Sequence, residues 1–260
     1  MEPLIRIVQI TDTHIMPKGE HWCSKTETLT NRRLQDVIEE VNALDPDFVV
    51  HTGDITDTGD LASYEHAKEL LDQLKAPYFL TCGNHDNFQN LKSVFPKQPF
   101  MSNHFALHDL NGSFIRTLIL DTRIPDKDEG VLCPERIQWL KDRLEEDSEK
   151  PTLLFMHHFP IEVQEPLFSS INLKNSSELE RIILTNPQIM GVYCGHYHHA
   201  ASAVFGGILC WISPSTAPSH VLEGSKCLGL TLSNPAYSLH SYQNKKTHSK
   251  IMTIAPFVPL

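Results

Sequence analysis

The chain has 260 residues, 40% of them hydrophobic, and a formal net charge of −10. This length suffices for one large α/β domain with a full hydrophobic core, and no Pro/Gly/Ser-rich or charge-rich linker divides it. We therefore expect a single domain over residues 1–260. The acidic balance argues against a general nucleic-acid-binding protein, which usually carries a basic face.

The sequence carries no sign of a membrane or secreted protein. Its aliphatic runs are all far shorter than the roughly 18 apolar residues that a membrane span requires. The N-terminal Met1-Glu2-Pro3 runs directly into a predicted strand, which is not typical of a secretion signal. Six cysteines lie far apart without a CxxC pair, which favours reduced thiols and a cytoplasmic protein.

The first half of the chain alternates predicted strands and helices. Apolar runs predict buried strands at residues 5–10, 48–52 and 78–81. An i, i+3, i+4 stripe over 34–44 predicts a helix between the first two strands, and a second stripe over 61–74 predicts another before the third. This order favours parallel neighbouring strands joined by right-handed crossovers.

The middle of the chain continues with shorter elements. We expect short strands near Phe105 and over 115–120, followed by a helix that opens with Pro134 in its first turn. Another helix is predicted to begin at Ser177, whose spacing to Glu180 matches a capping box.

Further strands complete the pattern. Runs over 153–156, 189–193, 208–212 and 227–232 are strand-like, and Lys245-Lys246 is typical of a hairpin turn. The whole predicts two mixed sheets flanked by helices, an α/β fold built as a four-layer α/β/β/α sandwich.

Polar motifs directly follow five of the predicted strands. In chain order they are Asp12-Thr13-His14, Gly53-Asp54, Gly83-Asn84-His85-Asp86, His157-His158 and Gly195-His196-Tyr197-His198. Side chains just past several parallel strands converge on one crevice, so we expect these motifs to share one edge of one sheet. Carboxylate, amide and imidazole groups suit divalent iron, manganese and zinc.

These five motifs, in this order, resemble the calcineurin-like metallophosphoesterase superfamily. The residues around them more narrowly resemble the class III cyclic nucleotide phosphodiesterases and their glycerophosphodiesterase relatives, and the resemblance extends from Ile5 to Ile254. It implies two divalent metal ions, iron or manganese with zinc as an alternative. It also implies in-line attack of a metal-bridging hydroxide on a small-molecule phosphodiester.

The resemblance also implies which residues hold the metals. One metal would be bound by Asp12, His14, Asp54 and His198, and the other by Asp54, Asn84, His157 and His196, with Asp54 bridging. The tandem His157-His158 offers two choices. We take His157 as the ligand, because its spacing to His196 resembles that of the glycerophosphodiesterase relatives, and place His158 beside the site.

Two further residues are candidates for catalysis. Cleavage of a phosphodiester expels an alkoxide that must be protonated, and the His85 imidazole beside two cations is a plausible donor. We expect the neighbouring Asp86 carboxylate to orient that ring.

The substrate is less well determined. Relatives often carry an aspartate in the loop 159–175; this chain lacks it around Ser169 but keeps Asn175. Candidate substrate-binding residues are Asn175, His199, His158 and Trp22, where Trp22 either stacks on a nucleobase or anchors its loop.

We expect 3′,5′-cyclic AMP as the substrate. A glycerophosphodiester, or another small diester or monoester, is the alternative. From another class, a non-catalytic metal-bound scaffold for a protein partner also stays open. No nucleic acid or membrane partner is expected, and a homo-oligomer is compatible with the sequence.

Overall fold

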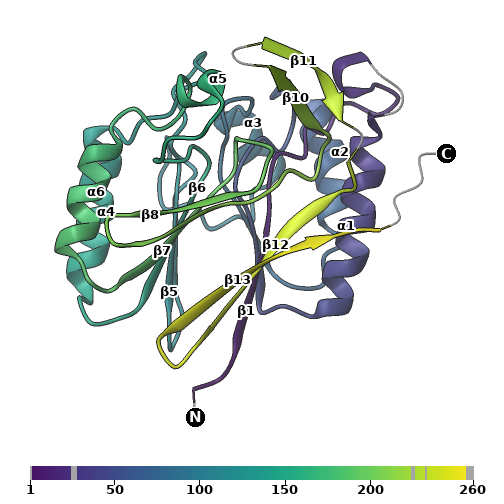
Figure 1. Ribbon diagram of the computed structural model, residues 1–260. Helices are drawn as coiled ribbons and strands as arrows, with labels where there is room; N and C mark the ends of the chain where they lie inside the picture. The colour runs from purple at the N-terminus through teal and green to yellow at the C-terminus, as the bar shows by residue number, and fades with distance from the viewer. Residues whose placement is uncertain (1, 25–27, 224–225, 232, 256–260) are drawn as a thin grey trace.

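The structure is a computed structural model that describes residues 2–24, 28–223, 226–231 and 233–255. Two β-sheets lie between two layers of helices, with α4 and α6 on one outer side and α1 and α2 on the other (Figure 1). This arrangement confirms the predicted α/β/β/α sandwich.

The first sheet has the strand order β13-β12-β1-β2-β3. Its strands are β1 (Ile5–Ile10), β2 (Phe48–His51), β3 (Tyr78–Leu80), β12 (Ala236–Gln243) and β13 (Lys246–Thr253). The first three are parallel and are connected by α1 (Thr30–Leu44) and α2 (Leu61–Leu71), as the sequence predicts. A short helix, α3 (Phe88–Val94), follows β3.

The second sheet has the order β4-β5-β6-β7-β9-β8. Its strands are β4 (His108–Asn111), β5 (Arg116–Leu120), β6 (Thr152–Met156), β7 (Ile189–Cys194), β8 (Ala201–Phe205) and β9 (Ile208–Ile212). Helices α4 (Pro134–Glu146) and α6 (Ser176–Thr185) cover its outer face (Figure 1).

Three short elements gather at one end of the sandwich (Figure 1). They are the 3₁₀ turn η1 (Trp22–Ser24), helix α5 (Pro166–Ser169) and a separate two-stranded hairpin of β10 (Ser219–Glu223) and β11 (Lys226–Thr231). This end also holds the polar motifs.

Hydrophobic side chains fill all three spaces between the four layers. One cluster lies between the first sheet and its helices, and a second between the other sheet and α4 and α6. A third joins the facing sheets and includes Ile7, Val50, Leu153, Phe155 and Tyr193. Because the central strands are buried on both faces, their sequences are mostly apolar, with the buried Gln9 of β1 as an exception.

The motif-bearing strands do not share one sheet, contrary to the expectation from sequence. Strands β1, β2 and β3 belong to the first sheet, whereas β6 and β7 belong to the second. Their ends nevertheless meet, since the His157 ring after β6 reaches the backbone carbonyl of Thr52 after β2 at 2.8 Å. The crevice therefore lies between two sheets and not along one.

Other local differences are small. The strand expected near Phe105 begins at His108, and the predicted capping box at Ser177 is wrong, because Asn175 is the N-cap residue of α6 and Ser177 lies inside the helix. Among the helices of the described residues, none is long and apolar enough to cross a membrane.

Candidate metal centre

Sharp turns at the strand ends place the polar motifs. Five residues of these motifs have positive φ without being glycine: Asp12 (51°), His14 (44°), Asp54 (50°), His196 (71°) and His198 (63°). Such left-handed conformations cost free energy and persist only where surrounding contacts hold them. Here the turns hold one another, because Thr13 N donates to Asp54 O at 2.9 Å and His196 N to an Asp12 carboxylate oxygen at 3.0 Å.

Glycines allow these turns to pack tightly. A Cβ atom on Gly83 would lie 2.2 Å from Asp54 Oδ1, and one on Gly195 would lie 2.0 Å from Thr11 Oγ1. Both distances are far inside van der Waals contact. The glycines in the Gly-Asn-His and Gly-His-Tyr-His motifs are therefore required by the approach of neighbouring loops.

One group of four buried side chains meets at the end of β1. We call Asp12, His14, Asp54 and His198 the first donor group. The His14 and His198 Nε2 atoms are 3.1 Å apart. Carboxylate oxygens complete the cluster, with Asp54 Oδ2 3.7 Å from His14 Nε2 and Asp12 Oδ1 3.5 Å from His198 Nε2.

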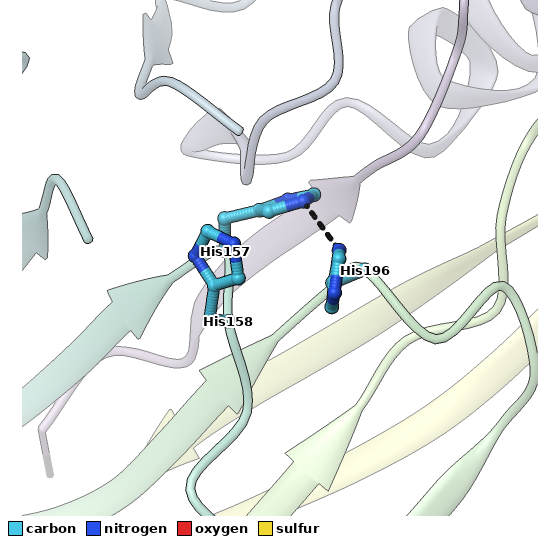
Figure 2. Close-up of side chains that lie close together, drawn as sticks. All are labelled: His157, His158 and His196. Carbon is cyan, nitrogen blue, oxygen red and sulfur yellow. Dashed lines mark hydrogen bonds between the residues drawn. The ribbon is translucent and has the colours of Figure 1, made fainter. Parts of the chain in front are cut away.

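A second group lies on the other side of Asp54. We call Asp54, Asn84, His157 and His196 the second donor group. His157 Nε2 lies 3.4 Å from Asp54 Oδ2, 3.1 Å from Asn84 Oδ1 and 3.1 Å from His196 Nδ1. Figure 2 shows a dashed line that joins a nitrogen of the His157 ring to a nitrogen of the His196 ring, with the His158 ring beside His157 and outside that contact. Asp54 is common to both groups.

The outer nitrogen of each imidazole in the two groups faces an oxygen that only accepts hydrogen bonds. His14 Nδ1 lies 3.1 Å from Asp57 Oδ1, and His198 Nδ1 lies 3.4 Å from Pro218 O. In the second group, His157 Nδ1 lies 2.8 Å from Thr52 O, and His196 Nε2 lies 3.1 Å from Ile171 O.

These contacts assign the tautomers. In each neutral ring the outer nitrogen carries the proton, so the inner nitrogen presents a lone pair. Two pairs of lone pairs then face each other at 3.1 Å, one in each group. Lone pairs at that distance repel unless a proton or a metal ion lies between them. Together with the carboxylate and amide oxygens beside them, these nitrogens form two donor sets that fit two metal ions.

The electrostatics of the cluster also favour bound cations. Burial and the neighbouring imidazoles lower the pKa of His196 and His198 well below 6.5, so both rings are neutral. Burial alone would lower the pKa of His157, but the Asp54 and Asp12 carboxylates outweigh it and raise that pKa to about 9. The two carboxylates therefore favour a positive charge at the His157 ring, and either a proton or a bound metal ion supplies it.

His158 lies next to the second donor group, but both of its ring nitrogens are engaged elsewhere. Nδ1 lies 2.8 Å from Thr122 Oγ1, and Nε2 lies 3.1 Å from Asp128 O. The side chain is fully buried and does not line the cavity above the donors. It packs beside the His157 and His196 rings.

The prediction that Asp86 orients the His85 ring is wrong. The buried Asp86 carboxylate instead accepts hydrogen bonds from Gly83 N, Ile55 N, Thr56 N and Tyr64 Oη, at 2.8–3.3 Å. These donors occupy its oxygens and tie the loop after β2 to the loop after β3. Asp86 thus supports the backbone of the motifs and does not orient the His85 ring.

Asp57 takes the position expected for Asp86. Its carbonyl accepts a hydrogen bond from His85 Nδ1 at 2.8 Å, and its Oδ1 lies 3.1 Å from His14 Nδ1. Sequence reasoning missed this residue. Its position in the sequence, three residues after Asp54 in the same loop, could have identified it as a candidate.

Trp22 anchors its loop. Its Nε1 donates to Asp57 Oδ1 at 2.8 Å, and its ring stacks on His14 with 4.6 Å between centroids and an interplanar angle of 16°. Only 4% of the side chain is exposed. One indole face therefore covers a residue of the first donor group.

A cavity of about 410 Å³ lies above the donors. Donor and loop residues form its floor, and Leu167, Phe168 and Ile171 form an apolar wall. Asn175 and His199 are not among the lining residues: the Asn175 amide bonds the backbone of Leu132, and His199 Nε2 faces His220 O. A larger cavity, about 830 Å³, lies beside α2 and β3 and contains none of these donors.

Two groups of donors that share one buried carboxylate, at the strand ends of an α/β/β/α sandwich, define a metal-dependent hydrolase. The sequence profile of the calcineurin-like phosphoesterases matches residues 5–200, and the chain belongs to this family. The resemblance noted from the motifs is thereby confirmed. Enzymes of this family use two divalent metal ions.

Similar proteins include two phosphodiesterases. A probable glycerophosphodiester phosphodiesterase of Arcobacter nitrofigilis is 33% identical over 219 residues, covering 82% of this chain and 78% of the relative. A 3′,5′-cyclic adenosine monophosphate phosphodiesterase of Vibrio vulnificus is 30% identical over 217 residues, covering 83% and 77%. A dimetal phosphatase structure from Danio rerio covers 97% of this chain and 99% of its own, with a TM-score of 0.73 at 12% identity, and shares the fold.

Proposed function

We propose that this enzyme is a phosphodiesterase that hydrolyses 3′,5′-cyclic AMP. The observation that carries the proposal is the pair of facing imidazole contacts, one in each donor group, on either side of Asp54. The relative from Vibrio vulnificus, named for cyclic AMP hydrolysis, supports the choice of substrate.

The two donor groups would each hold one metal ion. We assign Asp12, His14, Asp54 and His198 to one ion, and Asp54, Asn84, His157 and His196 to the other. Iron or manganese, with zinc as the alternative, suits these oxygen and nitrogen ligands. The bound cations would supply a nucleophile from water near neutral pH and neutralise charge on the phosphate.

We assign His85 as the general acid that protonates the leaving group. Its Nδ1 is held by the Asp57 carbonyl at 2.8 Å, so Nε2 is the ring nitrogen left to face the cavity. Burial lowers the pKa of His85, but the Asp54 carboxylate and the Asp57 contacts outweigh it and raise the pKa. A raised pKa keeps a proton on the ring near neutral pH, as a general acid requires.

The wall of the cavity favours a nucleoside over a small polar alcohol. Leu167, Phe168 and Ile171 line the cavity beside the donors and give it an apolar side that can contact the nucleoside part of a substrate. A glycerol moiety would gain little from this wall. A glycerophosphodiester is the second candidate substrate, favoured by the relative from Arcobacter nitrofigilis.

A comparison of substrates tests the proposal. The protein is loaded with Mn²⁺ or Fe²⁺ and assayed with cyclic AMP, glycerophosphocholine and bis(p-nitrophenyl) phosphate. We expect a larger kcat/KM for cyclic AMP than for glycerophosphocholine. The reverse order would assign the enzyme to the second candidate. Metal-loaded protein inert towards all diesters and monoesters would instead support the metal-bound scaffold.

The role of His85 has its own test. His85→Ala is expected to lower kcat for cyclic AMP by roughly 10²- to 10⁴-fold, because an alkoxide needs a proton to leave. The loss should be much smaller for bis(p-nitrophenyl) phosphate, whose phenolate leaves without protonation. Equal losses on both substrates would contradict the role. His66→Ala is a control, since that ring bonds Met16 O and does not line the cavity.

A further inference from the structure

A buried hydrogen-bond network joins the two sheets beneath the metal centre, with Gln9 of β1 at its middle. Gln9 Nε2 donates to Thr52 Oγ1 and to the Cys194 carbonyl, each at 2.9 Å. Gln9 Oε1 lies 3.0 Å from His240 Nε2 in β12. One side chain thus contacts residues of β7, of β12 and of the turn after β2.

The chemistry of the partners fixes the orientation of the Gln9 amide. The Cys194 carbonyl only accepts, so the amide nitrogen must face it, and the amide oxygen must accept from His240. His240 then carries its proton on Nε2, and its Nδ1 accepts from Ser249 Oγ at 2.9 Å. Both amide protons and the amide oxygen of Gln9 are used, and Gln9 and Thr52 are fully buried.

Thr52 and Cys194, the two residues to which the Gln9 amide nitrogen donates, adjoin the second donor group. The Thr52 carbonyl accepts the hydrogen bond from His157 Nδ1 at 2.8 Å. Cys194 ends β7 and is followed by Gly195 and His196. Thr52 belongs to the first sheet's side of the crevice and Cys194 to the second sheet, so Gln9 fixes the separation of the two sheets where both histidines are held.

We propose that Gln9 is a positioning residue for the second donor group: it holds Thr52 and Cys194 so that the His157 and His196 donor atoms stay in register for one metal ion. The inference rests on the proposed assignment of these histidines as ligands. Within the part of the chain that the structure describes, the Gln9 side chain forms no hydrogen bond with Asp57 or Pro218, which hold the outer nitrogens of His14 and His198. Its removal should therefore weaken the metal ion of the second donor group more than the other metal ion.

The experiment compares Gln9→Met with a matched control, Ser238→Ala. Ser238 is the register partner of Gln9 across β1 and β12, is fully buried, and also links the sheets through Trp211 Nε1 at 2.9 Å and Ser213 Oγ at 2.8 Å. Mn²⁺ binding is measured by calorimetry, and thermal unfolding of the metal-free proteins is measured alongside. His196→Ala identifies which of the two dissociation constants belongs to the second donor group.

We expect Gln9→Met to raise the Kd of that metal ion roughly 10- to 100-fold, the usual effect of removing a group that orients a ligand. The other Kd should change by a smaller factor, and Ser238→Ala should lower Tm without changing either Kd. Unchanged binding in Gln9→Met, or equal changes in Gln9→Met and Ser238→Ala, would overturn the inference.

If Gln9→Met does not fold, Thr52→Val decides. This variant removes only the hydroxyl that accepts from Gln9 and leaves the carbonyl that holds His157. It should weaken the same metal ion, and unchanged binding would overturn the inference. Wild-type protein that binds no Mn²⁺ would instead contradict the proposed function, so the two failures are distinguishable.

Discussion

The two halves of the donor set are held in different ways. In the first group, the outer nitrogen of His14 faces the carboxylate of Asp57, and Trp22 stacks over the ring. In the second group, the outer nitrogens of His157 and His196 face backbone carbonyls. His198 of the first group faces the backbone carbonyl of Pro218, so only His14 is held by side chains of loops. Both histidines of the second group are held by the main chain, with the network around Gln9 beneath them.

The halves also differ in charge. The first group contains the carboxylates of Asp12 and Asp54, with Asp57 directly behind His14. In the second group the oxygen donors are the shared Asp54 carboxylate and the neutral amide of Asn84. Because negative charge near a cation strengthens its binding, we expect the first half to hold its metal ion more tightly and the second to exchange more readily.

The largest effect is expected where the halves meet. Asp54→Asn keeps the shape of the shared side chain but removes its charge, so both metal ions should bind more weakly and kcat/KM should fall by roughly a thousandfold. Metal content and steady-state kinetics measure this. Asp60→Asn is the control: Asp60 caps α2 by accepting from Ser63 N at 2.9 Å, and its change should leave metal content intact. Loss of one ion only would show that Asp54 is not shared.

The next effect distinguishes the tandem histidines. His157→Ala should remove the metal ion of the second half and lower kcat/KM by roughly 10²- to 10³-fold, because a donor is lost. His158→Gln keeps groups that can bond Thr122 and Asp128, so it should change kcat/KM far less. Metal content of the two variants, measured side by side, decides the assignment. The opposite order would make His158 the ligand.

A third change tests the charge behind His14. Asp57→Asn keeps an oxygen for the bonds to His14 and Trp22 but removes the negative charge, whereas Asp57→Ala removes both. We expect the first metal ion to weaken roughly 10-fold in Asp57→Asn and roughly 100-fold in Asp57→Ala. Binding titrations with Mn²⁺ give both constants. Equal binding in wild type and both variants would remove the proposed difference between the halves.

The smallest effect on catalysis concerns a residue outside both halves and separates stability from function. Burial lowers the pKa of His108 from 6.5 to about 4, while its Nε2 faces Leu80 O at 2.8 Å. Between pH 6.5 and about pH 4, the imidazole of His108 is protonated in the unfolded chain but neutral in the folded protein. The folded protein is therefore fully stabilised by the neutral ring above pH 6.5 and loses this stability as the pH falls towards 4.

His108→Gln keeps a donor for Leu80 and cannot titrate. For each protein, the free energy of unfolding near pH 5 is compared with its value near pH 8. This decrease should be about 2 kcal/mol larger in the wild type than in the variant. Urea unfolding at both pH values measures this, and kcat/KM should stay unchanged. Parallel pH profiles of stability would show that His108 is already accessible to protons in the folded protein.

The sequence by itself determined the elements and the chemistry. Apolar runs marked β1, β2, β3, β6 and β7, helical stripes marked α1 and α2, and the polar residues just after the strands supplied the donors that the structure brings together. These signals are local: a strand buried on both faces is mostly apolar, and metal donors are few in kind.

Only the tertiary structure decided which strands share a sheet and which side chains meet. Periodicity cannot say which sheet a strand joins, so the motifs were wrongly expected on one sheet. Adjacency in sequence favoured Asp86 as the partner of His85, but Asp86 bonds to backbone donors, and Asp57 is the carboxylate residue that contacts His14 and His85. Asn175 was likewise taken by the backbone of Leu132. Burial makes the difference, because a buried polar group goes to whichever partner packing places within hydrogen-bond distance.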